Sequence, residues 1–155
     1  MGNAQNYDFG KTCKVVPAIA PVTQNSSAAA AITGLTIDRR ALPRQYYSCR
    51  VATMGRLTGS TQQVATIASA VQHSSDGTSW DSFSTATNQS GTIGSTGATG
   101  AQSTDGVAEQ VVNLANARRY IRVMPTPSFS LTTSGDTLAV NGVVVFGGAD
   151  ELPTS

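Results

Sequence analysis

A strand that runs into an Asp-Gly turn is the feature that most constrains this chain. Residues 71–75 are extended in character, and Asp76 and Gly77 follow them at once. Asp-Gly between two extended segments is a strong signal for a tight hairpin turn. Trp80 and Phe83 follow as aromatic anchors on the returning strand. The segment predicts antiparallel sheet, with these four residues holding the hairpin.

The composition favours strands and turns along the whole chain. Charged residues make up 12% of the 155 residues, whereas the chain contains 17 Ser, 20 Thr and 15 Gly. β-Branched residues suit a pleated sheet, and glycine is a poor helix former. A chain of this length forms one domain by default and buries a core without needing disulfides.

Turn residues separate a series of short extended segments. We predict an all-β fold, an antiparallel β-sandwich or jelly roll of about eight strands. Residues 1–13 are an extended N-terminal arm, residues 14–148 the single sandwich domain, and residues 149–155 a C-terminal tail. The expected extended segments are residues 14–20, 32–37, 45–54, 62–73, 107–114, 118–124, 129–132 and 137–146.

Three details of this assignment depend on Pro and Gly. Pro17 and Pro21 limit the first segment to an edge strand or an extended segment. Pro125 and Pro127 are expected to stop the strand that begins at residue 118. Residues 55–60 are expected to form a turn. Residues 137–146 form either one strand or a hairpin at Asn141-Gly142.

Residues 88–106 break the strand pattern. Gly91, Gly94, Gly97 and Gly100 recur at every third position. A collagen helix requires many such triplets together with proline, and these four have none. We therefore expect one long loop rich in Gly, Ser and Thr.

The sequence indicates neither a membrane span nor a disulfide. No apolar run approaches the ~20 residues that a spanning helix needs, and the first residues lack the charged and apolar regions of a signal peptide. Without an export signal, Cys13 and Cys49 are expected to be two reduced, buried thiols.

No group of residues has the pattern of a catalytic or cofactor site. His73 is the only histidine, and its neighbours Ser74 and Asp76 are adjacent in sequence, whereas catalytic groups usually come from separate segments. No carboxylate pair, P-loop or dinucleotide motif stands out, and one His with two distant Cys does not match a zinc site. We expect a protein that is not an enzyme and has no cofactor or metal.

Arginines are the candidate contact residues. They supply eight of the ten basic side chains, although the net charge is only +1, which argues against nucleic acid as a partner. Arginine suits bidentate pairs at protein interfaces, and the alternative is a set of solvated strand faces. The candidate partner-contact residues are Arg39, Arg40, Arg44, Arg50, Arg118, Tyr120 and Arg122.

Two segments resemble discoidin-type, galactose-binding-like jelly rolls. Residues 71–80 (VQHSSDGTSW) are similar to the hairpin of that family, and residues 117–123 (ARRYIRV) to a later strand. The resemblance implies a carbohydrate-binding module on a fibre or a secreted enzyme. A sugar or protein contact surface could then involve Tyr46, Tyr47, Trp80, Tyr120 and Arg122.

A second resemblance covers more of the chain. Ile37-Asp38, residues 74–80, residues 117–123 and residues 139–153 resemble segments of capsid cement, or decoration, proteins of tailed bacteriophages. The resemblance implies a homotrimeric virion protein, made in the host cytoplasm, that binds the outer surface of the head and stabilises contacts between major capsid protein subunits. Another phage structural role, as a head–tail connector or tail protein, is the remaining alternative.

Overall fold

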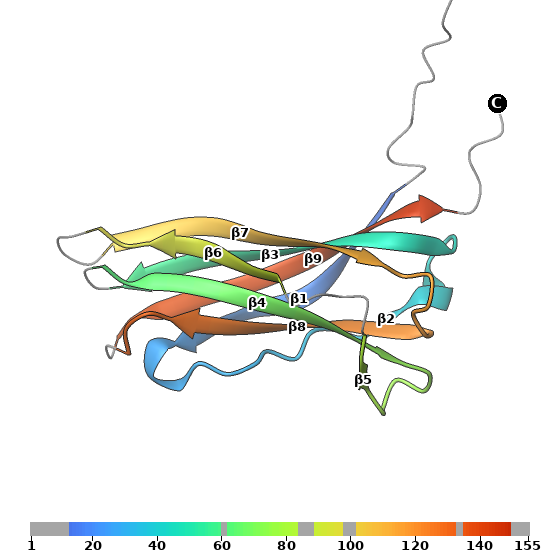
Figure 1. Ribbon diagram of the computed structural model, residues 1–155, viewed down its shortest axis with the longest axis horizontal. Coiled ribbons are helices and arrows are strands. Elements are labelled where there is room, and N and C mark those ends of the chain that lie inside the picture. The colour runs from blue at the N-terminus through green and yellow to red at the C-terminus, as the bar shows by residue number, and fades with distance from the viewer. Residues whose placement is uncertain (1–12, 60–61, 84–88, 98–101, 133–134, 150–155) are drawn as a thin grey trace, which may run out of the picture.

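Two antiparallel sheets face each other in the computed structural model, which describes residues 13–59, 62–83, 89–97, 102–132 and 135–149 (Figure 1). The prediction of an all-β sandwich is confirmed. Short 3₁₀ turns occupy Ser26–Ala28 and Arg39–Ala41. The strands of the described residues are β1 (Lys14–Asn25), β2 (Ile37–Asp38), β3 (Tyr46–Gly59), β4 (Val64–Ser74), β5 (Asp81–Ser82), β6 (Gln89–Ser95), β7 (Gln102–Asn113), β8 (Tyr120–Phe129) and β9 (Thr137–Ala149).

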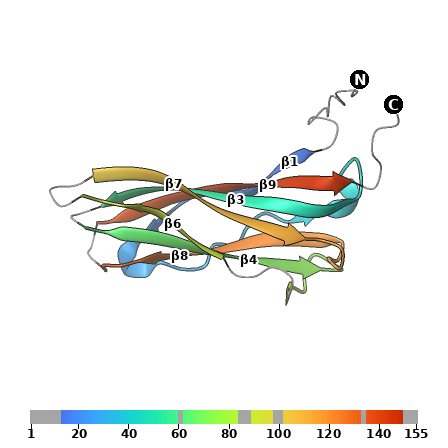
Figure 2. The same cartoon turned by 45° about the horizontal axis from the view of Figure 1, so that its top comes forward.

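One sheet has the order β1-β9-β3-β7, and the other has the order β2-β8-β4-β5 with β6 also paired to β4. The two layers are visible in both views (Figure 2). The core between them consists of inward-facing residues that alternate along each strand, as period-two patterning requires. Among its fully buried side chains are Val51, Leu57, Ile67, Leu114, Ile121, Leu138 and Phe146.

The first strand lies at a sheet edge and the last is continuous, although β1 extends to Asn25, beyond the expected residues 14–20. β1 is an edge strand, and its pairing with β9 is irregular between Pro17 and Val22, where the prolines interrupt the ladder. β9 is a single strand that passes through Asn141-Gly142. Residues 1–12 and 150–155 lie outside the described residues, so the N-terminal arm and most of the C-terminal tail stay predictions.

β8 runs through the two prolines that were expected to stop it. Gly34 N donates to Val123 O at 3.0 Å, and Ile32 N donates to Pro125 O at 2.8 Å. The N–H and C=O of one residue in an antiparallel strand point to the same side. The missing N–H of Pro125, and by alternation that of Pro127, therefore faces residues 32–34, and the ladder to β4 is intact.

β3 also continues where a turn was expected, at residues 55–59. Neighbours on both sides hold this stretch extended, because Gly55 pairs with Gly106 of β7 and with Val140 of β9. A Cβ on Gly55 would lie 2.8 Å from Cγ2 of Ile93. The glycine thus serves close packing between the sheets and does not form a turn.

The predicted loop at residues 88–106 is wrong. Residues 89–95 form β6, which pairs with β4 and lies beside β7, and β7 already begins at Gln102. A β-bulge at Ile93 breaks the alternation of β6. Gly91 and Gly94 both approach β7, where their Cβ atoms would lie 2.6 Å from Ala108 Cβ and 2.3 Å from Thr104 Cγ2. The three-residue spacing of these glycines therefore reflects a bulged strand packed against its neighbour.

Candidate functional site

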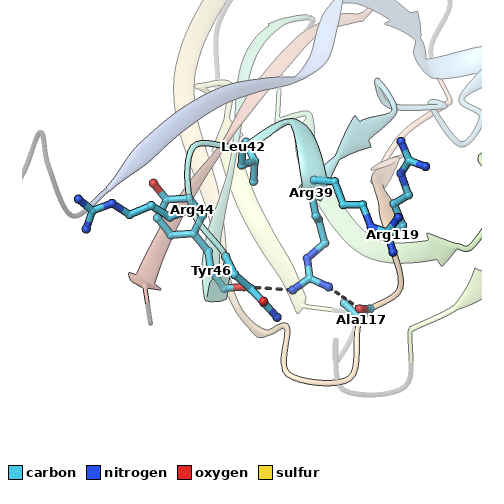
Figure 3. A pocket seen from close by; sticks show the side chains of 8 residues that line it. Arg39, Leu42, Arg44, Tyr46, Ala117 and Arg119 are labelled. Atoms are coloured by element: carbon cyan, nitrogen blue, oxygen red, sulfur yellow. Dashed lines mark hydrogen bonds between the residues drawn. The ribbon is translucent and has the colours of Figure 1, made fainter. Parts of the chain in front are cut away.

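Pairing of β2 with β8 brings two distant groups of arginines to one end of the sandwich. Asp38 lies opposite Tyr120, so the turn that follows residue 38 meets the segment that precedes residue 120. A pocket of about 500 Å³ lies between them, and we call it the arginine pocket (Figure 3). It is lined by Arg39, Arg40, Leu42, Arg44, Gln45, Tyr46, Ala117 and Arg119.

Arg39 ties three segments together through backbone carbonyls. Its Nη1 donates to the carbonyls of Ala117 and Arg118, and its Nη2 donates to those of Tyr46 and Leu114, at 3.1 and 3.2 Å. Figure 3 shows the bonds to Ala117 and Tyr46. Burial lowers the pKa of this guanidinium from its ordinary value. Arg39 was expected to be a partner contact, but its hydrogen bonds hold the chain's own turns in place.

Arg39→Lys should destabilise the fold although it conserves the charge. An ammonium group cannot reproduce the planar fork that reaches four carbonyls, and we expect a loss of about 2 kcal/mol in the free energy of unfolding. Urea denaturation checks this, with Arg40→Lys as the matched control on an exposed neighbour. Equal unfolding midpoints for the two variants would contradict the role assigned to Arg39.

Arg119 has a carboxylate partner, whereas the side chain of Arg40 has no ion pair within the described residues. Arg119 donates to the Asp38 carboxylate through Nε at 3.1 Å and through Nη2 at 2.7 Å, and its guanidinium lies 4.7 Å from the centre of the Tyr120 ring. This pairing holds the pKa of Asp38 below its ordinary value. The exposed side chain of Arg40 makes no hydrogen bond or ion pair within the described residues.

The predicted hairpin is present, but its loop is longer than a tight Asp-Gly turn. β5 pairs with β4 through His73 and Asp81, and Gly77 alone in this loop has a positive φ, of 79°. Asp76 Oδ1 accepts hydrogen bonds from the backbone N–H groups of Thr78 and Ser79, both at 2.8 Å. These bonds lower the pKa of Asp76 well below its usual range, because they favour the carboxylate.

The aromatic anchors of the hairpin lie in different surroundings. Phe83 is buried, with its ring centre 5.0 Å from that of His73. Trp80 is half-buried, and the guanidinium of Arg122 lies 4.2 Å from its ring centre. Arg122 also donates from Nε to Gln72 Oε1 at 2.8 Å, and Arg118 forms an ion pair with Asp81.

The aromatic residues proposed for a sugar surface do not form one open platform. Tyr46 is buried in the core against Phe146, with ring centres 5.7 Å apart, whereas Tyr47 is exposed. Arg122 covers Trp80. Simple alternation from the buried Cys49 and Val51 would place Tyr47 in the core and Tyr46 outside, so the alternation of β3 breaks at its first residues.

A second surface covers the outer face of the sheet β1-β9-β3-β7. Val15, Val107 and Val111 lie on it with 53%, 52% and 64% of their surface exposed. Shallow depressions of about 480 and 580 Å³ follow it and are lined in part by Ala52, Met54, Ala139 and Val145. We call this the apolar sheet face. The sequence alone did not predict this surface, because its residues come from four separate strands.

Arg50 belongs to this second surface and not to the arginine pocket. Its Nη1 lies 3.6 Å from Oε2 of Glu109, and Nε of Arg56 lies 3.8 Å from Oδ1 of Asp105. Both pairs are solvent-exposed, so each adds little to stability. The apolar sheet face therefore carries two exposed ion pairs among its valines.

Among the described residues, the cysteines belong to no metal-binding group. Both cysteines are thiols; Cys49 is buried, as expected, while Cys13 is only half-buried. Burial raises the pKa of the Cys49 thiol to about 12, so it is protonated at neutral pH. Within the described residues, no three His, Cys, Asp or Glu side chains are grouped as metal ligands. No helix in that part of the chain is long and apolar enough to cross a membrane.

The sequence matches no protein-family model, and no curated protein matches it significantly. Three solved structures are similar in part. The PBSX exported protein XepA has a TM-score of 0.42 and 11% identity, over 95% of this chain and 40% of that one. A chain of infectious bursal disease virus, Gx strain, has a TM-score of 0.44 and 9% identity, over 89% and 33%. VP2 in the subviral particle of infectious bursal disease virus has a TM-score of 0.41 and 14% identity, over 88% and 32%.

This chain therefore spans two fifths or less of the length of each of these proteins.

Proposed function

We propose that this chain is a non-enzymatic virion structural protein, a capsid cement or decoration protein that binds the outer surface of a phage head. It stabilises contacts between subunits of the major capsid protein. The apolar sheet face is the observation that carries the proposal. The resemblance of residues 37–38, 74–80, 117–123 and 139–153 to cement proteins supports the choice of partner.

The apolar sheet face is unusual for a face in water. An antiparallel sheet with one face on the core ordinarily presents polar side chains on the other. Here Val15, Val107 and Val111 expose more than half of their surface on the outer side of one sheet. Covering three valines contributes about 4.5 kcal/mol at most to binding, at about 1.5 kcal/mol each. A broad, shallow, apolar face with a few ion pairs suits a protein surface better than a small ligand.

Binding through this face would stabilise the shell by mass action. A protein that binds the assembled head and not its free subunits lowers the free energy of the assembled state. Closed symmetry in such assemblies favours a homotrimer at a three-fold position. Arg50 and Arg56, already on this face, would then exchange or share their carboxylate partners with the capsid subunits.

Cosedimentation with empty heads of the phage that encodes this chain tests the proposal. We expect the purified protein to pellet with the heads, and Val107→Asp with Val111→Asp to weaken binding about tenfold or more, because each substitution places a charge in an apolar contact. Leu35→Asp is the matched control, since Leu35 is 44% exposed outside the apolar sheet face. The proposal fails if the wild type stays in the supernatant, or if the double variant binds as the wild type does.

A further inference from the structure

The arginine pocket contains a half-buried cation that has no ion-pair partner among the described residues. The Arg39 guanidinium donates there to carbonyl oxygens. The carboxylate of Asp38, the residue before Arg39, accepts three hydrogen bonds from Arg119. Among the described residues, the charges of Arg39, Arg40 and Arg119 are therefore balanced only in part by Asp38, and positive charge is in excess at the pocket.

Arg40 adds a guanidinium that is open to a ligand. Its backbone N–H donates to Asp38 Oδ1 at 2.9 Å, which holds the backbone of Arg40 in place. Its side chain is exposed and makes no hydrogen bond or ion pair within the described residues. Guanidinium groups bind carboxylates in a bidentate manner. A fixed backbone with an unengaged arginine is suited to capturing an anionic group from outside.

The shape of the pocket favours a peptide over a nucleic acid. Leu42, Tyr46 and Ala117 form apolar parts of its wall, which suit the aliphatic stem of an acidic side chain. The net charge of the chain is only +1, so it lacks the extended excess of positive charge that binds a continuous phosphate backbone. One short acidic segment needs only the local excess at the pocket.

We propose that the arginine pocket binds an acidic peptide segment of a partner protein, with Arg40 pairing to its carboxylate and Arg39 supplying fixed positive charge. The identification of that partner as a capsid subunit rests on the proposed function. The binding of the acidic segment itself does not.

Fluorescence anisotropy with a labelled peptide Gly-Asp-Glu-Asp-Gly tests this inference at low ionic strength, where exposed charges are least screened. The amide peptide Gly-Asn-Gln-Asn-Gly is the matched ligand control. We expect Arg40→Gln to weaken binding of the acidic peptide about tenfold, the effect of one lost charge-assisted hydrogen bond. Arg56→Gln, which removes an exposed arginine from the apolar sheet face, should change it less than about twofold.

Three results would overturn the inference. Equal binding of the amide peptide would show that carboxylates are not recognised. Equal weakening by Arg40→Gln and Arg56→Gln would show attraction to overall charge and not to the pocket. Displacement of the peptide by an equal concentration of inorganic phosphate would identify a phosphate site. Peptide binding without head binding would instead contradict the proposed function alone.

Discussion

Gly106→Ala should lower the free energy of unfolding by about 3 kcal/mol, because it forces two packed strands apart. A Cβ on Gly106 would lie 1.8 Å from the carbonyl oxygen of Ile93. That atom belongs to the backbone of β6, so no side-chain rotation relieves the clash. Either β6 or β7 must shift, and β7 also carries Val107 and Val111 of the apolar sheet face.

Gly147→Ala is the matched control for this prediction. Its Cβ would lie 3.9 Å from Sγ of Cys13, which is ordinary contact distance, and its φ is not positive. Urea denaturation followed by circular dichroism compares the two alanine variants. If Gly106→Ala unfolds at the same midpoint as Gly147→Ala, β6 does not pack against β7 as described.

Gln63→Leu should lower the free energy of unfolding by about 4 kcal/mol, because the side chain is the centre of a buried polar network. Gln63 is fully buried. Its Nε2 donates to Leu131 O at 2.6 Å and to Asp136 Oδ2 at 2.7 Å, and its Oε1 accepts from Ser130 Oγ and Leu131 N at 2.9 and 2.8 Å. Leucine fills the space but leaves these groups without that partner, including a buried carboxylate.

A second buried glutamine provides a control, because replacing it is not expected to lower the free energy of unfolding. Gln110 is 2% exposed, and within the described residues neither its Nε2 nor its Oε1 has a hydrogen-bond partner. Gln110→Leu removes an unsatisfied buried amide from the core, so it should leave stability unchanged or raise it by about 1 kcal/mol. Calorimetry on both variants measures the difference. A similar loss of stability in the two would contradict the network assigned to Gln63.

Alternation within single strands was the reliable signal in the sequence. Period-two alternation along residues 62–73 places Ile67 and Val71 on one face of the strand, and both are buried. Proline was informative for β1, which is an edge strand, but misleading for β8. The difference depends on which side of the strand the missing N–H faces, and that side is set by the neighbouring chain. Pro125 is tolerated because residues 32–34 lie on that side.

The role of a glycine, like that of a proline, depended on the neighbouring strand. Gly91 and Gly94 were interpreted as parts of a loop, since glycine is common where chains bend. These positions require glycine because β7 lies close to them, and Ala108 and Thr104 occupy the space that a Cβ would take. The sequence of residues 89–95 does not show whether a glycine forms a loop or makes room for a neighbouring strand. Only the position of β7, which packs beside β6, shows this.

The candidate contact residues lie on two different surfaces of the sandwich. Arg39, Arg40, Arg44, Arg118, Tyr120 and Arg122 lie toward one end of the sandwich, whereas Arg50 lies on the outer face of the sheet β1-β9-β3-β7. Residue type alone marked them all as possible contacts. It could not show that the guanidinium of Arg39 donates hydrogen bonds to four carbonyls of its own chain.

The sequence by itself determined the all-β class, the inward and outward faces of most strands and the edge position of β1. These properties depend on backbone propensity and on period-two patterning, which act between residues near in sequence. Tertiary structure alone decided where the arginine groups meet, which glycines serve packing, and that an apolar face is left on one sheet. Those features depend on which distant strands pair, and that choice is set by the burial and hydrogen bonding of the whole domain.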